Sequence, residues 1–110
     1  MRIAVSVLAI LFALLHIIAA VTQLRSKDLA ARGSSVIMLC GGAALLCSAI
    51  SHLINSSLWA WMDTLSAACG FLLICFAAYL NGRRSGKVHL SHHLVRGGIA
   101  ALLVLGFILW

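Results

Sequence analysis

Residues 58–80 read LWAWMDTLSAACGFLLICFAAYL, an apolar stretch that holds a single charged side chain, Asp63. A helix needs about 17–25 mostly apolar residues to cross the hydrocarbon core of a bilayer, so this stretch is long enough. Three further stretches of the same character occupy residues 3–24, 36–54 and 94–110. The alternation of polar and apolar residues that transmembrane strands require does not occur. We therefore predict an all-α membrane protein built as a bundle of four transmembrane helices.

The composition of the chain agrees with this fold class. Of the 110 residues, 64% are hydrophobic and 9% are charged, whereas soluble domains carry about 25% charged residues. The first stretch is longer than the roughly 7–15 apolar residues of a signal peptide, so we interpret it as a helix of the mature protein. Four spans leave no room for a soluble domain. We predict one domain, residues 1–110, with helices at about 3–24, 35–55, 57–81 and 90–110.

The basic residues are concentrated between the apolar stretches. The net charge is +6, and residues 25–32 and 83–96 hold seven of the eight Lys and Arg, while Arg2 is the other. Because successive spans alternate in direction, these two segments share one side of the membrane. The positive-inside rule then places them in the cytoplasm and both termini outside, in the plasma (inner) membrane of the cell. Topology explains the charge, so we expect the lipid bilayer as a partner and no nucleic acid.

Short connections and capping residues predict the helix order. Residues 55–57, Asn-Ser-Ser, join the second and third stretches, so these helices form an antiparallel hairpin. We expect Ser34 or Ser35 to cap the second helix. We expect Asn81-Gly82 to end the third helix, because glycine suits the residue after a helix C-terminus.

Small and polar residues recur every three or four positions along the first three stretches. Small residues allow helix backbones to approach closely in lipid, and an average spacing of 3.5 is typical of left-handed packing. We predict that these residues form packing seams, and that their polar members could line a cavity. The fourth stretch has a weaker pattern, so its helix is expected to lie at the periphery or to face another subunit. The seams contain Ser6, Ala9, Ala13, His16, Ala20 and Gln23; Gly41, Ala44, Ser48, Ser51 and Asn55; and Asp63, Ser66, Gly70, Ala77 and Asn81, with Leu73 filling the gap in the third seam.

Asp63 is one of only two carboxylate side chains in the sequence. At the centre of a spanning helix such a group costs about 2.5–3.5 kcal/mol, and less near the ends, so it needs a partner, a proton or a polar pocket. Across the predicted hairpin, His52 and Asp63 differ in depth by roughly 5 Å at 1.5 Å per residue, which side chains can bridge. We predict either a protonatable or ion-binding site or a polar clamp that only holds the hairpin. The pocket would be lined by Ser48, Ser51, Ser66 and Asn55.

The remaining histidines offer a metal or haem site as an alternative. His89, His92 and His93 share one face if the fourth helix begins before them, and imidazoles bind transition metals. The other interpretation is a solvated interfacial segment. His16 and His93 could form an axial haem pair only across a depth mismatch of roughly 6 Å. We expect no cofactor, with haem or a transition metal as the alternative.

Catalytic patterns are missing from the sequence. The four cysteines all lie in apolar stretches without CxxC spacing, and we interpret them as packing residues. No nucleophile with a neighbouring base and no phosphate-binding loop is present. We therefore expect the protein not to be an enzyme.

The length and the four-helix plan resemble those of the small multidrug resistance transporters. That family relies on a membrane-embedded glutamate in its first helix, whereas this chain contains no Glu and has His16 in its first apolar stretch. The resemblance covers length and helix count only, and no residue role is transferred. Three function classes remain: a homo-oligomeric transporter or channel-like protein with a protonatable Asp63/His52 site; a non-catalytic accessory subunit of a larger membrane complex; and a haem- or quinone-linked redox subunit.

Overall fold

The computed structural model describes residues 1–54, 60–86 and 90–110. In these residues the chain forms four helices and no strands. The helices are α1 (Arg2–Leu24), α2 (Leu29–Ile54), α3 (Ala60–Arg84) and α4 (Leu90–Leu109). Each is long and apolar enough to cross a membrane. The all-α prediction with four candidate spans is confirmed.

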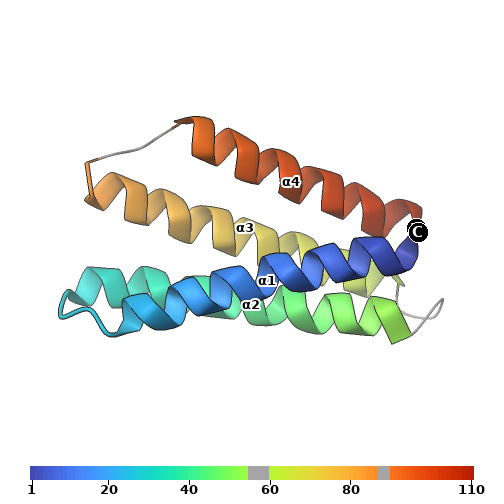
Figure 1. Cartoon of the computed structure of the whole chain (residues 1–110), viewed down its shortest axis with the longest axis horizontal. Coiled ribbons are helices and arrows are strands. Elements are labelled where there is room, and N and C mark those ends of the chain that lie inside the picture. Colours follow the sequence, from blue (N-terminus) through green and yellow to red (C-terminus); the bar gives the residue numbers. More distant parts are fainter. Residues whose placement is uncertain (55–59, 87–89) are drawn as a thin grey trace.

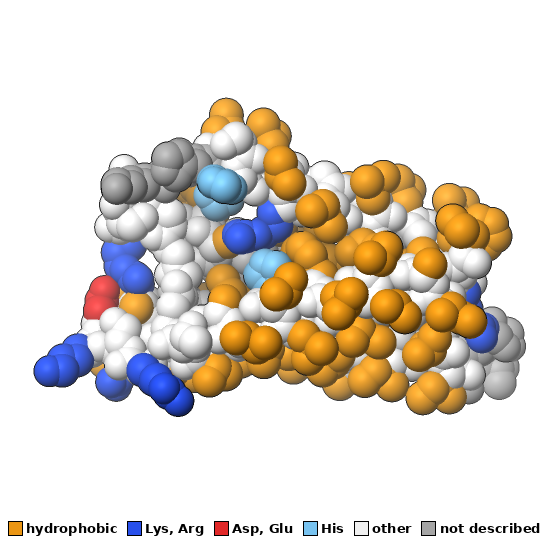
Figure 2. All heavy atoms as spheres, in the orientation of Figure 1, with side chains coloured by type: hydrophobic (Ala, Val, Ile, Leu, Met, Phe, Trp, Pro, Cys, Tyr) orange, Lys and Arg blue, Asp and Glu red, His pale blue; other side chains and the backbone are white. Residues whose placement is uncertain are grey.

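Successive helices run antiparallel, so the bundle has two distinct ends (Figure 1). At one end, which we call the basic end, lie the C-termini of α1 and α3 and the N-termini of α2 and α4. Figure 2 shows Lys and Arg side chains gathered at this end. The other end, which we call the terminal end, holds both termini of the chain together with the end of α2 and the start of α3.

The start of α2 corrects the predicted cap. The helix begins well before residue 35, and Asp28 caps it, because its Oδ1 accepts a hydrogen bond from the Ala30 N–H at 2.9 Å. Ser34 and Ser35 lie inside α2 and are buried, with both hydroxyls bonded to the Ala31 carbonyl. The capping prediction was wrong because aspartate caps a helix as well as serine does, and it stands earlier in the chain.

The end of α3 also differs from the prediction. The helix continues through Asn81 and Gly82 to Arg84, and the left-handed glycine is Gly86, with φ 68°. The Gly86 N–H donates to the Arg83 carbonyl at 3.3 Å, which closes the last turn. The predicted start of this helix, near residue 57, and the predicted end of the second, at residue 55, lie outside the described residues.

Small residues bring α1, α2 and α3 together as the seams predict. A Cβ placed on Gly41 would lie 2.8 Å from the Gly70 carbonyl oxygen, and a Cβ on Gly70 would lie 2.8 Å from the Gly41 oxygen. The backbones of α2 and α3 are therefore in direct contact at this crossing. In α1 the buried residues are Val5, Ser6, Ala9, Ala13 and Ala20. The large aliphatic side chains point mainly outward, where Figure 2 shows a broad apolar surface.

The buried residues of helix α4 all lie in its second half. Its buried residues are Ala100, Leu103, Gly106 and Phe107, and Val5 of α1 fits against Gly106. Its first half diverges from α1 and α3 toward the basic end (Figure 1). Helix α4 is thus the least embedded of the four, as its weaker pattern of small residues predicts.

Candidate functional site

The predicted pair, His52 and Asp63, lies buried at the terminal end of the bundle. His52 is in the last turn of α2 and Asp63 in the first turn of α3, with 3% and 8% of their surfaces exposed. The two groups are close enough to interact electrostatically. Among the described residues, no ion pair or hydrogen bond joins the two side chains. The fold therefore brings them near each other without neutralising either by direct contact.

The His52 ring is held by packing. It lies against the Phe107 ring of α4, with 4.6 Å between ring centroids and 33° between planes. Its Nε2 is buried without a hydrogen-bond partner among the described residues, and the same holds for the Ser6 hydroxyl of α1. Leaving a buried polar group unpaired costs about 1–3 kcal/mol, so such groups call for a function or a bound proton, ion or water.

Arg2 joins this end of the bundle, although the sequence reasoning did not include it in the site. Its Nη2 donates to the Leu53 carbonyl at 3.5 Å, and its charge acts on the nearby His52. A cation at a helix C-terminus interacts favourably with the helix dipole. The sequence feature that could have identified Arg2 was its position as the only Lys or Arg outside the two basic segments.

Two of the serines predicted to line the pocket, Ser48 and Ser66, form hydrogen bonds between α2 and α3. The Ser48 hydroxyl donates to the backbone carbonyl of Asp63, and the Ser66 hydroxyl donates to the Ala44 carbonyl at 3.4 Å. Both bonds cross the helical hairpin. Ser51 is half-buried on α2. Asn55, the remaining predicted lining residue, lies outside the described residues.

A second polar cluster, which we call the amide network, links three helices near the basic end. Gln23 Oε1 of α1 accepts hydrogen bonds from Asn81 Nδ2 of α3 at 3.0 Å and from the Ser35 hydroxyl of α2 at 3.1 Å. The Ser34 hydroxyl contacts Asn81 Oδ1. Sequence reasoning assigned these serines to a cap and Asn81 to a helix end. The signal for the network was the presence of Gln23 and Asn81 in the small-residue seams.

Beside this network lies a cavity of about 430 Å³, which we call the basic-end cavity. Its polar lining residues are His16, Gln23, Asn81 and Arg96, and its apolar lining residues are Leu15, Ala19, Met38 and Ala78. His16 Nδ1 lies 2.7 Å from the Phe12 carbonyl oxygen, which can only accept, so Nδ1 carries a proton and Nε2 remains for another partner. Figure 2 shows a hollow in the side of the bundle with basic and His side chains beside it.

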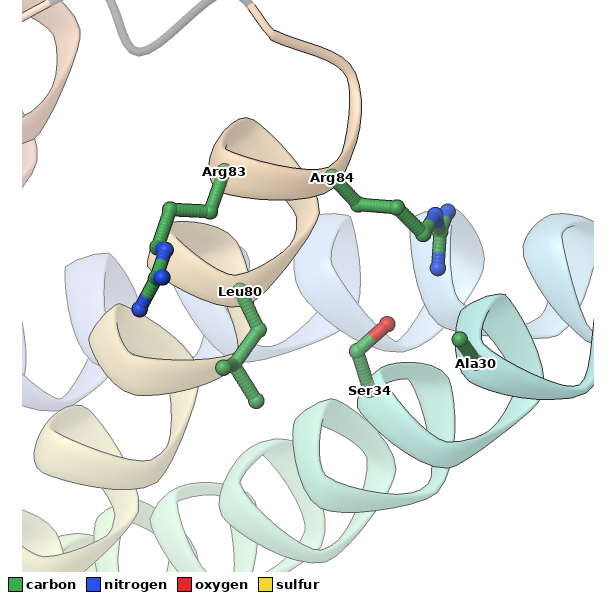
Figure 3. A pocket seen from close by; sticks show the side chains of 5 residues that line it. All are labelled: Ala30, Ser34, Leu80, Arg83 and Arg84. Carbon is green, nitrogen blue, oxygen red and sulfur yellow. The ribbon is translucent and has the colours of Figure 1, made fainter.

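A smaller groove, of about 360 Å³, lies between the start of α2 and the end of α3 (Figure 3). Arg83 and Arg84 extend from α3 on opposite sides of it. Arg84 Nε pairs with Asp28 Oδ2 at 3.2 Å, with both side chains partly exposed. An exposed pair of this kind contributes about 0–1 kcal/mol to stability. The main consequence of the contact is that the charge of Asp28 is balanced by Arg84.

Two of the three histidines of the predicted cluster lie in the part of the chain that the structure describes, so the predicted metal site stays a prediction. His92 is exposed and His93 half-buried, with the His93 ring 6.3 Å from that of Tyr79. His89 lies outside the described residues. No group of three or more His, Cys, Asp or Glu among residues 1–54, 60–86 and 90–110 could hold a metal ion. All four cysteines are free, and three of them are exposed on the outer surface instead of filling the interior.

Comparisons of the chain with family models, with curated proteins and with solved structures give no match. Any functional assignment therefore has to come from the geometry of these two polar regions.

Proposed function

We propose that the protein is a small membrane transporter or channel-like protein that moves protons or a small cation, with Asp63 and His52 as its protonatable site. The observation that carries this proposal is a buried carboxylate next to a buried imidazole whose Nε2 has no partner among the described residues. Ionisable groups inside membrane spans are rare and commonly mark proton or ion pathways.

The chemistry of the pair supports an exchangeable ion. A carboxylate locked in an ion pair is held charged, whereas Asp63 has no such bond to His52 or Arg2 in the described structure. Asp63 can therefore take up a proton or a cation when one arrives. His52 Nε2 can accept or donate a proton, and Arg2 keeps a positive charge near His52.

The packing of a single chain points to self-association. Leu45, Ile74 and Ala67 are fully buried where α2 and α3 meet, and Gly41 touches Gly70 there, so little space remains for a path between these helices. We infer that a transport path would run between subunits of a homo-oligomer. We also infer that the basic end faces the cytoplasm of the plasma membrane and that both termini face outward, because seven of the eight Lys and Arg lie in the two basic segments.

The test uses the only two acidic side chains as a matched pair. The purified protein is reconstituted into liposomes containing a pH-sensitive dye, and proton uptake is driven by a potassium gradient with valinomycin. Asp63→Asn should lower the flux at least tenfold, because the amide cannot exchange a proton at this position. Asp28→Asn, which changes an exposed carboxylate at the basic end, should leave the flux unchanged. Equal flux from Asp63→Asn and the unaltered protein would contradict the proposal.

A non-catalytic accessory subunit of a larger membrane complex is the second candidate, and α4 is the observation that favours it. At Gly97 and Gly98, no atom beyond the adjacent backbone of α4 lies within 4 Å of the position that a Cβ would occupy, so this part of α4 has room for a close contact. Glycine faces suit close helix contact in lipid. This candidate predicts no flux from the purified chain and co-purification with a larger membrane protein after mild solubilisation. A homo-oligomer that is active alone would exclude it.

A further inference from the structure

The basic-end cavity contains a cationic side chain, Arg96, that pairs with no carboxylate among the described residues. Arg96 lines the cavity from α4 and is only half-exposed. Of the two acidic side chains in the sequence, Asp28 pairs with Arg84, and Asp63 lies at the terminal end. No ion pair to Arg96 occurs among the described residues. An arginine placed in this way favours an external anion, because its guanidinium presents several N–H donors in a planar fork.

Further hydrogen-bonding groups converge on the same space. Gln23 Oε1 is occupied by Asn81 and Ser35, which leaves the Gln23 NH₂ group as the donor that remains for a cavity ligand. His16 Nδ1 donates to the Phe12 carbonyl, so in the neutral ring Nε2 is a hydrogen-bond acceptor on the cavity wall and can accept from a protonated oxygen of a ligand. Arg96 is near enough to His16 for the two to interact electrostatically. The cavity therefore combines a cation with polar groups from α1, α3 and α4.

The position of the cavity suits a ligand with both polar and apolar parts. Arg96 is the seventh residue of α4, so its Cα lies roughly 9 Å along the helix from Leu90, near the level of the bilayer interface. The first half of α4 diverges from the bundle, and the cavity opens beside it (Figures 1 and 2). Leu15, Met38 and Ala78 supply apolar wall next to the polar groups. Basic pockets between spanning helices are known to receive lipid head groups.

We propose that the basic-end cavity binds a phosphate or similar oxyanion group, with Arg96 as its main contact and the Gln23 NH₂ group as a supporting donor. The anion can belong to an anionic lipid of the surrounding leaflet or to a small soluble ion, and the test separates these sources. The site is independent of Asp63, which lies at the other end of the bundle.

Binding is measured by native mass spectrometry of the protein in detergent, titrated with dioleoylphosphatidylglycerol, dioleoylphosphatidylcholine or inorganic phosphate. The unaltered protein should bind phosphatidylglycerol more tightly than phosphatidylcholine. Arg96→Gln should weaken phosphatidylglycerol binding at least tenfold, and Arg96→Lys less so, because lysine keeps the charge without the fork. Competition by millimolar phosphate would identify a soluble anion as the ligand, and failure of phosphate to compete would identify the lipid.

Two further variants make the result decisive. Arg25→Gln removes an exposed charge at the same end and should leave phosphatidylglycerol binding unchanged. Gln23→Glu keeps an oxygen for Asn81 and Ser35 but replaces the free NH₂ with a negative oxygen, so it should also lower binding at least tenfold. This variant decides the question if Arg96→Gln does not fold. Equal losses for Arg96→Gln and Arg25→Gln, or full binding by Gln23→Glu, would overturn the proposal in favour of diffuse surface attraction.

Discussion

The contact between Gly41 and Gly70 allows a quantitative prediction about what holds α2 and α3 together. In Gly70→Ala, the new Cβ would lie 2.8 Å from the Gly41 carbonyl oxygen and 3.0 Å from the Leu45 nitrogen. Both are backbone atoms, so no side-chain rotation can relieve the contact. Restoring an ordinary separation of 3.4 Å requires the helices to move apart by 0.6 Å.

The expected cost follows from this geometry. Overpacking a closely packed interior costs about 1–3 kcal/mol, and a clash with backbone belongs at the upper end of that range. The higher helix propensity of alanine relative to glycine offsets about 1 kcal/mol of this cost. We therefore expect Gly70→Ala to lower the free energy of unfolding by about 2 kcal/mol. The measurement is an SDS titration in mixed micelles, followed by far-UV circular dichroism.

Gly98→Ala is the matched control, because no atom beyond the adjacent backbone of α4 lies within 4 Å of its Cβ position. This variant should be as stable as the unaltered protein, or more stable by up to about 1 kcal/mol. If Gly70→Ala and Gly98→Ala unfold at the same SDS fraction, the two backbones are not in contact and the packing argument is wrong.

Three further predictions concern the polar contacts. Asn81→Leu removes hydrogen bonds from the amide network and should lower the free energy of unfolding by about 1 kcal/mol in the same titration, whereas Thr22→Ala, at an exposed hydroxyl, should have little effect. Asp28→Ala removes the cap of α2 and should cost about 1 kcal/mol, seen as faster hydrogen exchange in its first turn; unchanged exchange would argue against the cap. Ser48→Ala removes a bond to the Asp63 carbonyl and should reduce stability by about 0.6–1.7 kcal/mol while proton flux persists, and lost flux at full stability would instead make the hydroxyl part of the pathway.

The number of helices and their membrane-spanning character could be predicted from the sequence, because lipid offers no hydrogen-bond partners to the backbone. Every backbone polar group in a bilayer must be satisfied within the protein, so a long apolar stretch has almost no alternative to a helix. The small-residue seams were predictable for a related reason, since Ala9, Ala13 and Gly70 are what close backbone approach requires. The placement of His52 and Asp63 near the same end also followed from their distance to the predicted turn, whereas the burial of both side chains is a finding of the structure. The precise start of α2 could not be predicted from the sequence, because Asp28 and Ser34 are both good capping residues and local sequence does not distinguish between them.

Contacts between helices were decided by tertiary structure alone. The amide network needs Gln23, Ser35 and Asn81 to meet at one depth, which depends on how far each helix is rotated and shifted against its neighbours. The basic-end cavity depends on the divergence of α4, which leaves Arg96 facing His16 without a carboxylate. Sequence spacing defines which residues share a face of one helix, but the partners of that face lie many residues away. The amino-acid sequence by itself therefore determined the four spans and their seams, and only the packed bundle decided which polar groups face a partner, a neighbouring backbone or an open cavity.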